Sequence, residues 1–142
     1  MPVNVYYVQE FKQNNRIGSA FPVPDKSKEW ILNNLKSKHC KPCEGGVCPL
    51  DESHSIQQLG EVPGWELSED GKAIVRVCKF TDFRATMLFI NAMAYMAEQQ
   101  GHHPDFSAGY NYCEVRYTTH AIGGLSENDF ICAAKINELL ES

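Results

Sequence analysis

The chain contains no long hydrophobic run and no cluster of basic residues. A membrane-spanning helix needs about 20 consecutive apolar residues, and no uninterrupted apolar run approaches that length. We therefore expect no membrane-embedded segment. The formal net charge is −5, and no local group of Lys and Arg residues offsets it. The composition thus argues against a surface that binds nucleic acid directly.

The amino terminus also lacks the features of a targeting signal. Residues 1–12 mix polar and charged side chains with apolar ones. They show neither the positive region and apolar run of a secretory signal nor the Arg-rich composition of a transit peptide. Without an export signal, the six cysteines are expected to be reduced thiols rather than a disulfide framework. We predict a cytoplasmic location, with the nucleus as an alternative.

What the chain does have is the size and composition of one soluble globular domain. It has 142 residues, of which 43% are hydrophobic and 22% are charged. Five of the seven prolines and a Cys/Gly-rich tract fall within residues 1–49. We interpret residues 1–49 as an amino-terminal extension and residues 50–142 as the folded domain.

Seven elements are expected within this domain, from helical and strand-like periodicity and from turn signals. In chain order they are a helix over 51–59, strands over 65–67 and 73–80, a helix from 81 or 82 to about 100, strands over 105–108 and 112–119, and a helix from 126 to about 140. The order α-β-β-α-β-β-α predicts an α+β fold. It favours a four-stranded antiparallel sheet with three helices packed on one face.

The long helix is predicted to bury one face. Its apolar positions step by three or four residues, which is typical of a single helix face. They are Phe83, Met87, Ile90, Ala94 and Ala97. Gly101 suits the end of this helix, because glycine readily adopts the left-handed backbone that follows many helix C-termini.

Three of the five histidines lie within nineteen residues of one another. His102 and His103 follow the long helix, and His120 follows the last predicted strand. Pro104 disfavours helical dihedrals in the residue before it, so the helix must end by then. If the turn between the last two strands is centred on Tyr110, His120 lies opposite about residue 100. The sequence therefore predicts a cluster of imidazoles, the side chains best suited to moving protons near neutral pH.

Two other interpretations of the histidines stay open. A lone histidine is most often an ordinary polar surface residue, although the convergence of three through a hairpin weakens that interpretation. Three imidazoles can also hold a catalytic zinc ion. Against a metal site, adjacent residues of an extended chain point in opposite directions. His102 and His103 are therefore poorly placed to bind one ion together.

The motifs around the histidines resemble those of the pterin-4a-carbinolamine dehydratase family. The resemblance rests on His102-His103-Pro104, Tyr110-Asn111, Thr118-Thr119-His120 and Gly124-Leu125-Ser126 with Asp129. It extends to Pro63-Gly64-Trp65, Phe80-Thr81-Asp82-Phe83 and the last helix, and it covers about residues 50–140. The family fold that it implies, an antiparallel four-stranded sheet with three helices on one side, agrees with the predicted element order.

The resemblance implies a hydro-lyase that dehydrates 4a-hydroxytetrahydropterin to quinonoid dihydropterin, and so recycles tetrahydropterin after aromatic amino-acid hydroxylation. It implies a small-molecule pterin substrate, acid/base catalysis by histidine, and neither a metal nor a redox cofactor. His102, His103 and His120 match the family's three active-site histidines. We expect His103 and His120 at the reacting edge of the pterin, with His102 orienting the substrate or sharing the acid role. Which imidazole is acid and which is base stays open.

Further site residues follow from the same resemblance. Glu98 and Asp129 are expected to orient imidazoles, although Glu98 is also explained as a solvated helix residue and Asp129 as a helix cap. Some family members carry an acidic residue where this chain has Gly101. Five residues are predicted to bind the substrate or shape its pocket: Gly101, Pro104, Thr118, Thr119 and Ala121.

The resemblance also bears on partners. Family members are commonly dimers or tetramers, so we expect a homo-oligomer. In animals a family member also serves as a dimerisation cofactor for a homeodomain transcription factor, and family-like proteins that have lost the histidines act in assembly. A non-catalytic transcriptional cofactor or assembly protein on the same scaffold is therefore the alternative function. The presence of all three histidines here favours the enzyme.

The cysteines allow one metal hypothesis. Cys40, Cys43 and Cys48, with His39 or His54 nearby, have the ligand types of a tetrahedral zinc site. The spacing is not the repeated CxxC of a zinc ribbon. Longer family members carry a similar Cys-x-x-Cys-x-Gly-Gly tract, which favours a glycine-rich loop leading into the domain. The remaining cysteines are expected to be small core residues: Cys78, Cys113 and Cys132.

Overall fold

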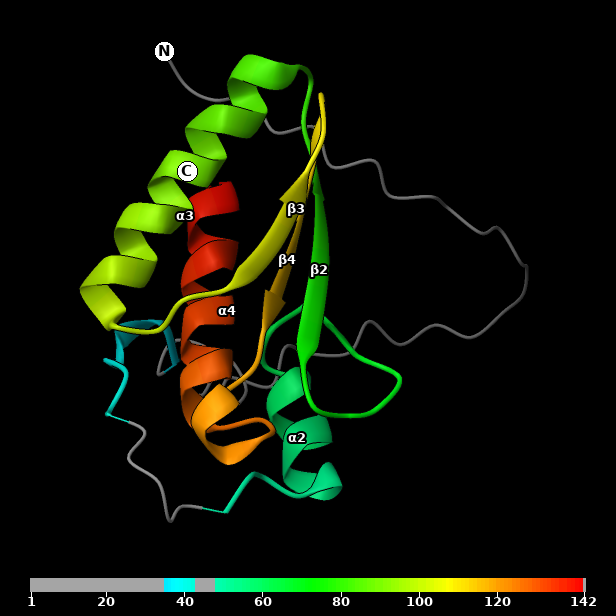
Figure 1. Ribbon diagram of the computed structural model, residues 1–142, viewed down its shortest axis with the longest axis vertical. Coiled ribbons are helices and arrows are strands. Elements are labelled where there is room, and N and C mark those ends of the chain that lie inside the picture. The colour runs from blue at the N-terminus through cyan, green and yellow to red at the C-terminus, as the bar shows by residue number, and fades with distance from the viewer. Residues whose placement is uncertain (1–34, 43–47, 142) are drawn as a thin grey trace, which may run out of the picture.

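The computed structural model describes residues 35–42 and 48–141, so most of the predicted extension lies outside the described residues. The elements follow the predicted order, with one short 3₁₀ helix added before the last helix (Figure 1). They are α2 (Glu52–Leu59), β1 (Glu66–Leu67), β2 (Ile74–Lys79), α3 (Phe83–Gln100), β3 (Asp105–Ala108), β4 (Tyr112–Tyr117), η1 (His120–Ile122) and α4 (Glu127–Glu141). None of the described helices is long and apolar enough to cross a membrane.

The four strands form one antiparallel sheet in the spatial order β1-β2-β4-β3. Helices α3 and α4 lie beside each other, and both contact β4 (Figure 1). The core lies between these helices and the sheet, where Tyr117, Phe130 and Ile136 are fully buried. The predicted α+β class with a four-stranded antiparallel sheet is confirmed.

The hairpin of β3 and β4 carries the chain from one histidine group to the other. Asp105 pairs with Arg116, one position later than a turn centred on Tyr110 requires. Strand β4 ends two residues before the predicted end, because the chain then turns into η1. The hairpin nonetheless returns His120 to the level at which α3 ends, so the predicted convergence holds with a one-residue shift in register.

The buried face of α3 differs from the predicted one. The buried residues of this helix form a different stripe, consisting of Thr86, Phe89, Met93 and Ala97. Ala97 is the one member of the predicted stripe that is buried, and Phe83 stays 54% exposed. Thr86 explains the error. Its hydroxyl lies 3.0 Å from the Asp82 oxygen and 3.1 Å from the Tyr110 oxygen, so its one proton has two backbone acceptors within reach. A hydroxyl satisfied in this way can lie in a core.

Local hydrogen bonds fix both ends of α3. The Asp82 carboxylate accepts a hydrogen bond from the Ala85 N–H at 2.8 Å, which caps the first turn. At the other end, Gly101 has a φ of +60°, a left-handed conformation that residues with a side chain adopt only with strain. The His102 N–H then donates back to the Ala97 oxygen at 3.2 Å. The predicted stop at Gly101 is confirmed, and it places the histidine pair directly after the helix.

Residues 35–42 pack against the domain, although the sequence interpretation assigns them to the extension. Leu35 is only 4% exposed and belongs to the core. Lys38 Nζ lies 2.6 Å from the Glu127 carboxylate at the start of α4, and Lys135 Nζ donates to the Lys36 oxygen at 2.8 Å. This segment therefore lies along α4. The domain boundary near residue 50 stays a prediction.

Candidate active site

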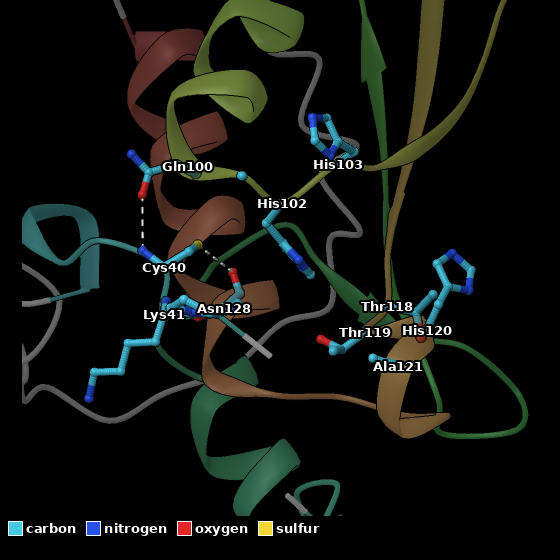
Figure 2. Close-up of a pocket in the computed structure, with 12 residues that line it drawn as sticks. Cys40, Lys41, Gln100, His102, His103, Thr118, Thr119, His120, Ala121 and Asn128 are labelled. Atoms are coloured by element: carbon cyan, nitrogen blue, oxygen red, sulfur yellow. Dashed lines mark hydrogen bonds between the residues drawn. The ribbon is translucent and has the colours of Figure 1, made fainter. Parts of the chain in front are cut away.

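A cavity of about 450 Å³ opens where the end of α3, η1 and the start of α4 meet (Figure 2). Such a volume is typical of sites for small molecules. The three predicted catalytic histidines, His102, His103 and His120, all line this cavity. Each of them lies next to a carboxylate, but the three pairs differ widely in their exposure to solvent.

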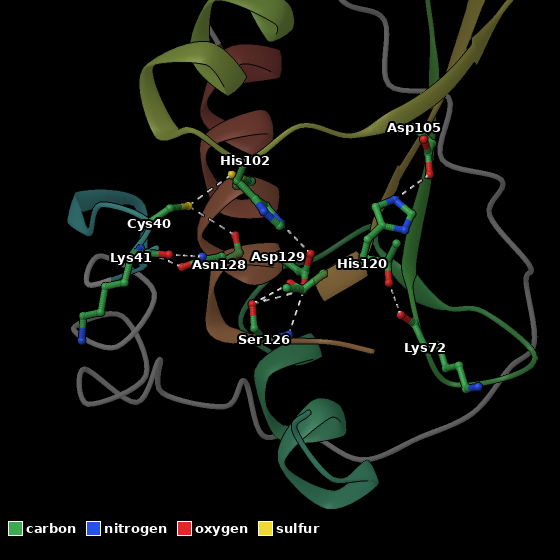
Figure 3. A network of polar contacts seen from close by, with 12 residues as sticks. Cys40, Lys41, Lys72, His102, Asp105, His120, Ser126, Asn128 and Asp129 are labelled. Carbon is green, nitrogen blue, oxygen red and sulfur yellow. Dashed lines mark hydrogen bonds and ion pairs between the residues drawn. The ribbon is translucent and has the colours of Figure 1, made fainter. Parts of the chain in front are cut away.

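His102 belongs to the most buried pair. Its Nε2 lies 2.7 Å from Asp129 Oδ1, and the side chains are 11% and 0% exposed respectively (Figure 3). The imidazole stacks on the Tyr117 ring, with centroids 5.5 Å apart and an interplanar angle of 14°. A carboxylate has only acceptor atoms, so we assign the Nε2 proton to His102. In the neutral ring, Nδ1 is then the nitrogen without a proton.

Asp129 makes the contacts that both of its predicted roles require. As a helix cap, its Oδ2 accepts from the Ser126 N–H at 2.8 Å. The same oxygen accepts from Thr119 Oγ1 at 2.8 Å, while Oδ1 faces His102. The carboxylate is therefore held by donors from the residue just before α4 and from the residue just before η1. Its burial makes this arrangement rigid, because moving the carboxylate would leave buried donors unpaired.

His103 forms an exposed pair with Glu98. Its Nε2 lies 3.0 Å from Glu98 Oε2, and the side chains are 63% and 78% exposed. Glu98 is predicted to orient one of the imidazoles. It lies on the last turn of α3 and contacts His103, not His102. Exposed pairs of this kind contribute only about 0–1 kcal/mol. The His103 ring is therefore guided by Glu98 but not locked.

His120 faces a carboxylate that the sequence interpretation missed. Its Nε2 lies 3.6 Å from Asp105 Oδ2, a charge contact that is too long for a good hydrogen bond (Figure 3). Asp105 begins β3 and pairs with Arg116 of β4. The predicted hairpin register could have identified Asp105, because the first residue of β3 must lie near the residues that follow β4.

The predicted substrate-binding residues lie mostly at the cavity. Gly101, Thr118, Thr119 and Ala121 line it, whereas Pro104 is not among the described residues that do so. Both threonine hydroxyls already have partners. Thr118 Oγ1 donates to the Lys72 oxygen at 2.7 Å, and Thr119 Oγ1 donates to Asp129. The proton of each threonine hydroxyl is therefore already used within the protein, and the expectation that these residues shape the pocket through their backbone stays a prediction.

One wall of the cavity comes from residues 40–42, which the sequence did not assign to the site. The Cys40 N–H donates to Gln100 Oε1 at 3.1 Å, and the Lys41 N–H donates to Asn128 Oδ1 at 3.0 Å (Figure 2). Asn128 Nδ2 donates back to the Lys41 oxygen at 2.7 Å. Nearly ninety residues separate Lys41 from Asn128 in sequence. No local pattern could have revealed this contact.

The cysteine predictions have mixed outcomes. Cys78, Cys113 and Cys132 are all buried, as predicted. Burial raises the pKa of Cys78 and of Cys113 to about 11. Among residues 35–42 and 48–141, no group of three or more side chains is placed to hold a metal ion. Cys43 lies outside the described residues, so the zinc hypothesis for the Cys/Gly-rich tract stays a prediction.

Comparison with known sequences identifies similar proteins along most of the chain. The family model described as Pterin 4 alpha carbinolamine dehydratase matches residues 48–139. Relatives from Nitrosospira multiformis and Nitrosomonas eutropha each carry the name "Putative pterin-4-alpha-carbinolamine dehydratase". The first is 48% identical over 113 residues, which is 80% of this chain and 98% of the relative. The second is 51% identical over 110 residues, which is 77% of this chain and 96% of the relative.

A solved structure from Brucella melitensis has a similar fold. It is described as a transcriptional coactivator/pterin dehydratase. The two structures superpose with a TM-score of 0.62 at 34% sequence identity, over 64% of this chain and 97% of that one. The family match thus contains all three histidines of the cavity, whereas the wall formed by residues 40–42 lies outside it.

Proposed function

The chain belongs to the pterin-4a-carbinolamine dehydratase family, and we propose that it dehydrates 4a-hydroxytetrahydropterin to quinonoid dihydropterin. The observation that carries the proposal is that three imidazoles, each beside a carboxylate, line one cavity. A dehydration needs one group to accept a proton and another to donate one, and imidazole can do either near neutral pH. We further propose that the reaction serves to recycle tetrahydropterin.

The proposed reaction is balanced in atoms and electrons without a further reactant. A base removes the proton from N5, and the electron pair of that N–H bond forms the new double bond between N5 and C4a. The bond from C4a to the hydroxyl oxygen breaks as an acid protonates that oxygen, and water leaves. No electron is gained or lost overall, so no redox cofactor is needed. We propose that imidazoles supply both acid and base, without a metal ion.

We propose that His103 and His120 divide the acid and base roles. Their side chains are 63% and 76% exposed, so both can contact a bound ligand and exchange protons with water. Each turnover moves one proton onto the base and one from the acid, and both groups must be reset before the next turnover. An exposed imidazole is suited to this exchange. Which of the two takes the N5 proton stays open.

We propose that His102 positions the pterin rather than resetting a proton in each cycle. Asp129 holds its Nε2, and its ring lies flat against Tyr117. Burial raises the pKa of the Tyr117 phenol, so this neighbour stays neutral. A side chain held so firmly is suited to fix the orientation of a substrate, which lowers the entropy cost of reaching the transition state.

A non-catalytic role on the same scaffold is the alternative. The description of the Brucella melitensis protein includes a coactivator as well as a dehydratase. The pairing of every imidazole in the cavity with a carboxylate supports the enzyme, because a scaffolding role does not require any of these pairs.

We also propose that the chain forms a homo-oligomer, either a dimer or a tetramer. Large apolar side chains are exposed along α3, namely Phe83, Met87, Leu88 and Tyr95. Phe83 and Met87 belong to the stripe that the sequence predicted to be buried. Contact with a second copy would bury this stripe, and so would reconcile the apolar pattern of α3 with its exposure in a single chain.

The experiment that tests the enzyme is an absorbance assay of dehydration with purified full-length protein. The 4a-hydroxytetrahydropterin is generated in the cuvette, and formation of quinonoid dihydropterin is followed with time. We expect clear acceleration over buffer, and we expect His103→Gln and His120→Gln each to lower kcat by roughly 100-fold or more. Folded wild-type protein that leaves the buffer rate unchanged would overturn the proposal.

His54→Gln is the matched control for these variants. His54 is also an exposed histidine beside a carboxylate, with its Nδ1 2.9 Å from Asp51 Oδ2, but it lies on α2 outside the cavity. We expect this variant to keep the wild-type kcat. A loss equal to that of the cavity variants would show that the assay reports general damage rather than catalysis.

A further inference from the structure

Two cysteines meet beside the candidate active site. Cys40 Sγ lies 3.5 Å from Cys132 Sγ, although the residues are 92 positions apart in the sequence. Both are free thiols in this structure. Cys40 lines the cavity, whereas Cys132 on α4 is fully buried. Only Cys40 Sγ, which Figure 2 shows at the cavity, is therefore placed to meet a small reagent that enters it.

The two thiols are chemically unequal. The hydrogen bond from Cys132 lowers the pKa of Cys40, and the electrostatic effects of His102 and Lys135 act in the same direction, whereas burial and the Asp129 carboxylate raise it. The same hydrogen bond, together with burial, raises the pKa of Cys132. Cys40 is thus the thiol of the pair that loses its proton more readily, and Cys132 is the neighbour that keeps its proton and can donate it in the hydrogen bond. The thiolate is the nucleophilic form of cysteine.

We infer that Cys40 and Cys132 form a redox-active pair that a hydroperoxide oxidises to a disulfide at the wall of the cavity. In the first step, the Cys40 thiolate attacks the peroxide and the O–O bond breaks. Cys40 becomes a sulfenic acid, and the departing alkoxide takes up a proton to leave as an alcohol, or as water from hydrogen peroxide. In the second step, the Cys132 sulfur attacks Cys40 Sγ, the S–O bond of the sulfenic acid breaks, and the hydroxyl group leaves as water with the proton of the Cys132 thiol. The two thiols lose two electrons, and the hydroperoxide gains them.

The surrounding structure allows the two sulfurs to approach. A disulfide requires an S–S distance of about 2.05 Å, so the pair must close by about 1.5 Å from its present 3.5 Å separation. Cys40 belongs to a segment without regular secondary structure. Its N–H is held by the side chain of Gln100, not by a strand ladder. A shift of this size therefore requires adjustment of side-chain contacts and leaves the sheet intact.

Cys78 and Cys113 provide an internal comparison within the same chain. They face each other in register across β2 and β4, and both are buried. Burial raises the pKa of each to about 11, and neither lines the cavity. They are close in space but lack both the thiolate character and the access of Cys40. We expect them to stay reduced under conditions that oxidise the Cys40–Cys132 pair.

The test uses the reduced full-length protein and hydrogen peroxide. After a short exposure, free thiols are blocked with N-ethylmaleimide under denaturing conditions, and the digest is examined by mass spectrometry. We expect one cross-linked peptide pair that joins Cys40 to Cys132, with Cys78 and Cys113 carrying the maleimide. The absence of this cross-link, or a Cys40 bond to Cys43 or Cys48 in its place, would overturn the inference.

Two variants separate the steps. Cys132→Ala removes the second thiol, so Cys40 should stop at the sulfenic acid and be labelled by dimedone. Cys48→Ser should form the cross-link as the wild type does.

Because the cross-link closes a long loop, oxidation should raise the melting temperature of the wild type by about 5 °C or more, and dithiothreitol should reverse this increase. Dimedone labelling spread over all cysteines of Cys132→Ala would refute a specific role for Cys40.

The inference goes beyond the dehydratase proposal and does not depend on it. The cross-link is read by mass and needs no pterin, so an inactive protein that forms it would leave the redox pair standing. Conversely, an active dehydratase without the cross-link would reject the redox pair alone.

Discussion

Replacing Asp129 with asparagine tests the most buried pair of the site. The substitution keeps the size of the side chain but removes its charge. Oδ2 of Asp129 accepts from the Ser126 N–H and from Thr119 Oγ1, so the amide oxygen of the Asp129→Asn variant must take this place. The amide nitrogen then faces His102 Nε2, 2.7 Å away in the native pair. The neutral imidazole must accept there and carry its proton on Nδ1 instead.

The size of the effect follows from what the substitution removes. A hydrogen bond to a charged group contributes about 1.5–3 kcal/mol. If this restraint is needed in the transition state, kcat should fall by roughly 10- to 150-fold, because about 1.4 kcal/mol corresponds to a factor of ten. The rate is measured in the dehydration assay. The His102 tautomer is measured independently from its imidazole ¹⁵N chemical shifts, and far-UV circular dichroism checks that the variant is folded.

Glu98→Gln is the matched control, because it removes the charge from the exposed pair with His103. Both members of that pair are mostly exposed, so its contribution is at most about 1 kcal/mol and kcat should fall by no more than about fivefold. The reasoning fails if Asp129→Asn shifts the His102 tautomer yet leaves kcat within a factor of two of wild type. It also fails if Glu98→Gln proves the more damaging change.

Three further predictions concern α3 and the cavity wall. Leu88→Glu places a charge on the exposed apolar surface of α3, so sedimentation velocity should show a smaller species than the wild type. An unchanged sedimentation coefficient would place any interface elsewhere. The pKa of Cys40 is lowered, so the alkylation rate of Cys40 by iodoacetamide, resolved by mass spectrometry, should reach half its maximum at a lower pH in the folded protein than in the same protein unfolded in urea. A midpoint that is the same or higher in the folded protein would contradict the assigned asymmetry. Gly101→Ala places a side chain on a residue with a φ of +60°. The free energy of unfolding, measured in urea, should fall by about 1–2 kcal/mol. An unchanged free energy of unfolding would mean that the helix end can adopt another conformation.

Local signals explain why much of the fold could be predicted. The turn residues and alternation around Tyr110 gave the bounds of β3 correctly. The glycine after α3 and the acidic residue before it gave the ends of that helix. These features act within a few residues of the chain, so the sequence states them directly. The one-residue shift in the hairpin register depends on how the turn closes, which the alternation of side chains alone does not determine.

Two of the missed features depend on contacts between residues that are distant in the sequence. The buried face of α3 depends on whether Thr86 finds acceptors, and one of its acceptors is the Tyr110 oxygen from the distant hairpin. The cavity wall at residues 40–42 depends on amide contacts with Asn128 on α4. Asp105 could have been found by extending the hairpin register to the residues beyond it. Resemblance to a family named the three histidines but did not assign a carboxylate to each.

The graded burial of the three imidazole–carboxylate pairs is itself an argument for the proposed division of labour. A group that must gain or lose a proton in every turnover needs a route to water, and His103 and His120 have one. A group that fixes the substrate needs a side chain whose position fluctuates little. The buried ion pair with Asp129 restrains the His102 ring in this way. If all three imidazoles were buried, resetting the protons would be slow. If all three were exposed, no rigid imidazole would hold the pterin in a fixed orientation relative to the acid and the base. The single buried pair beside two exposed ones satisfies both requirements in one cavity.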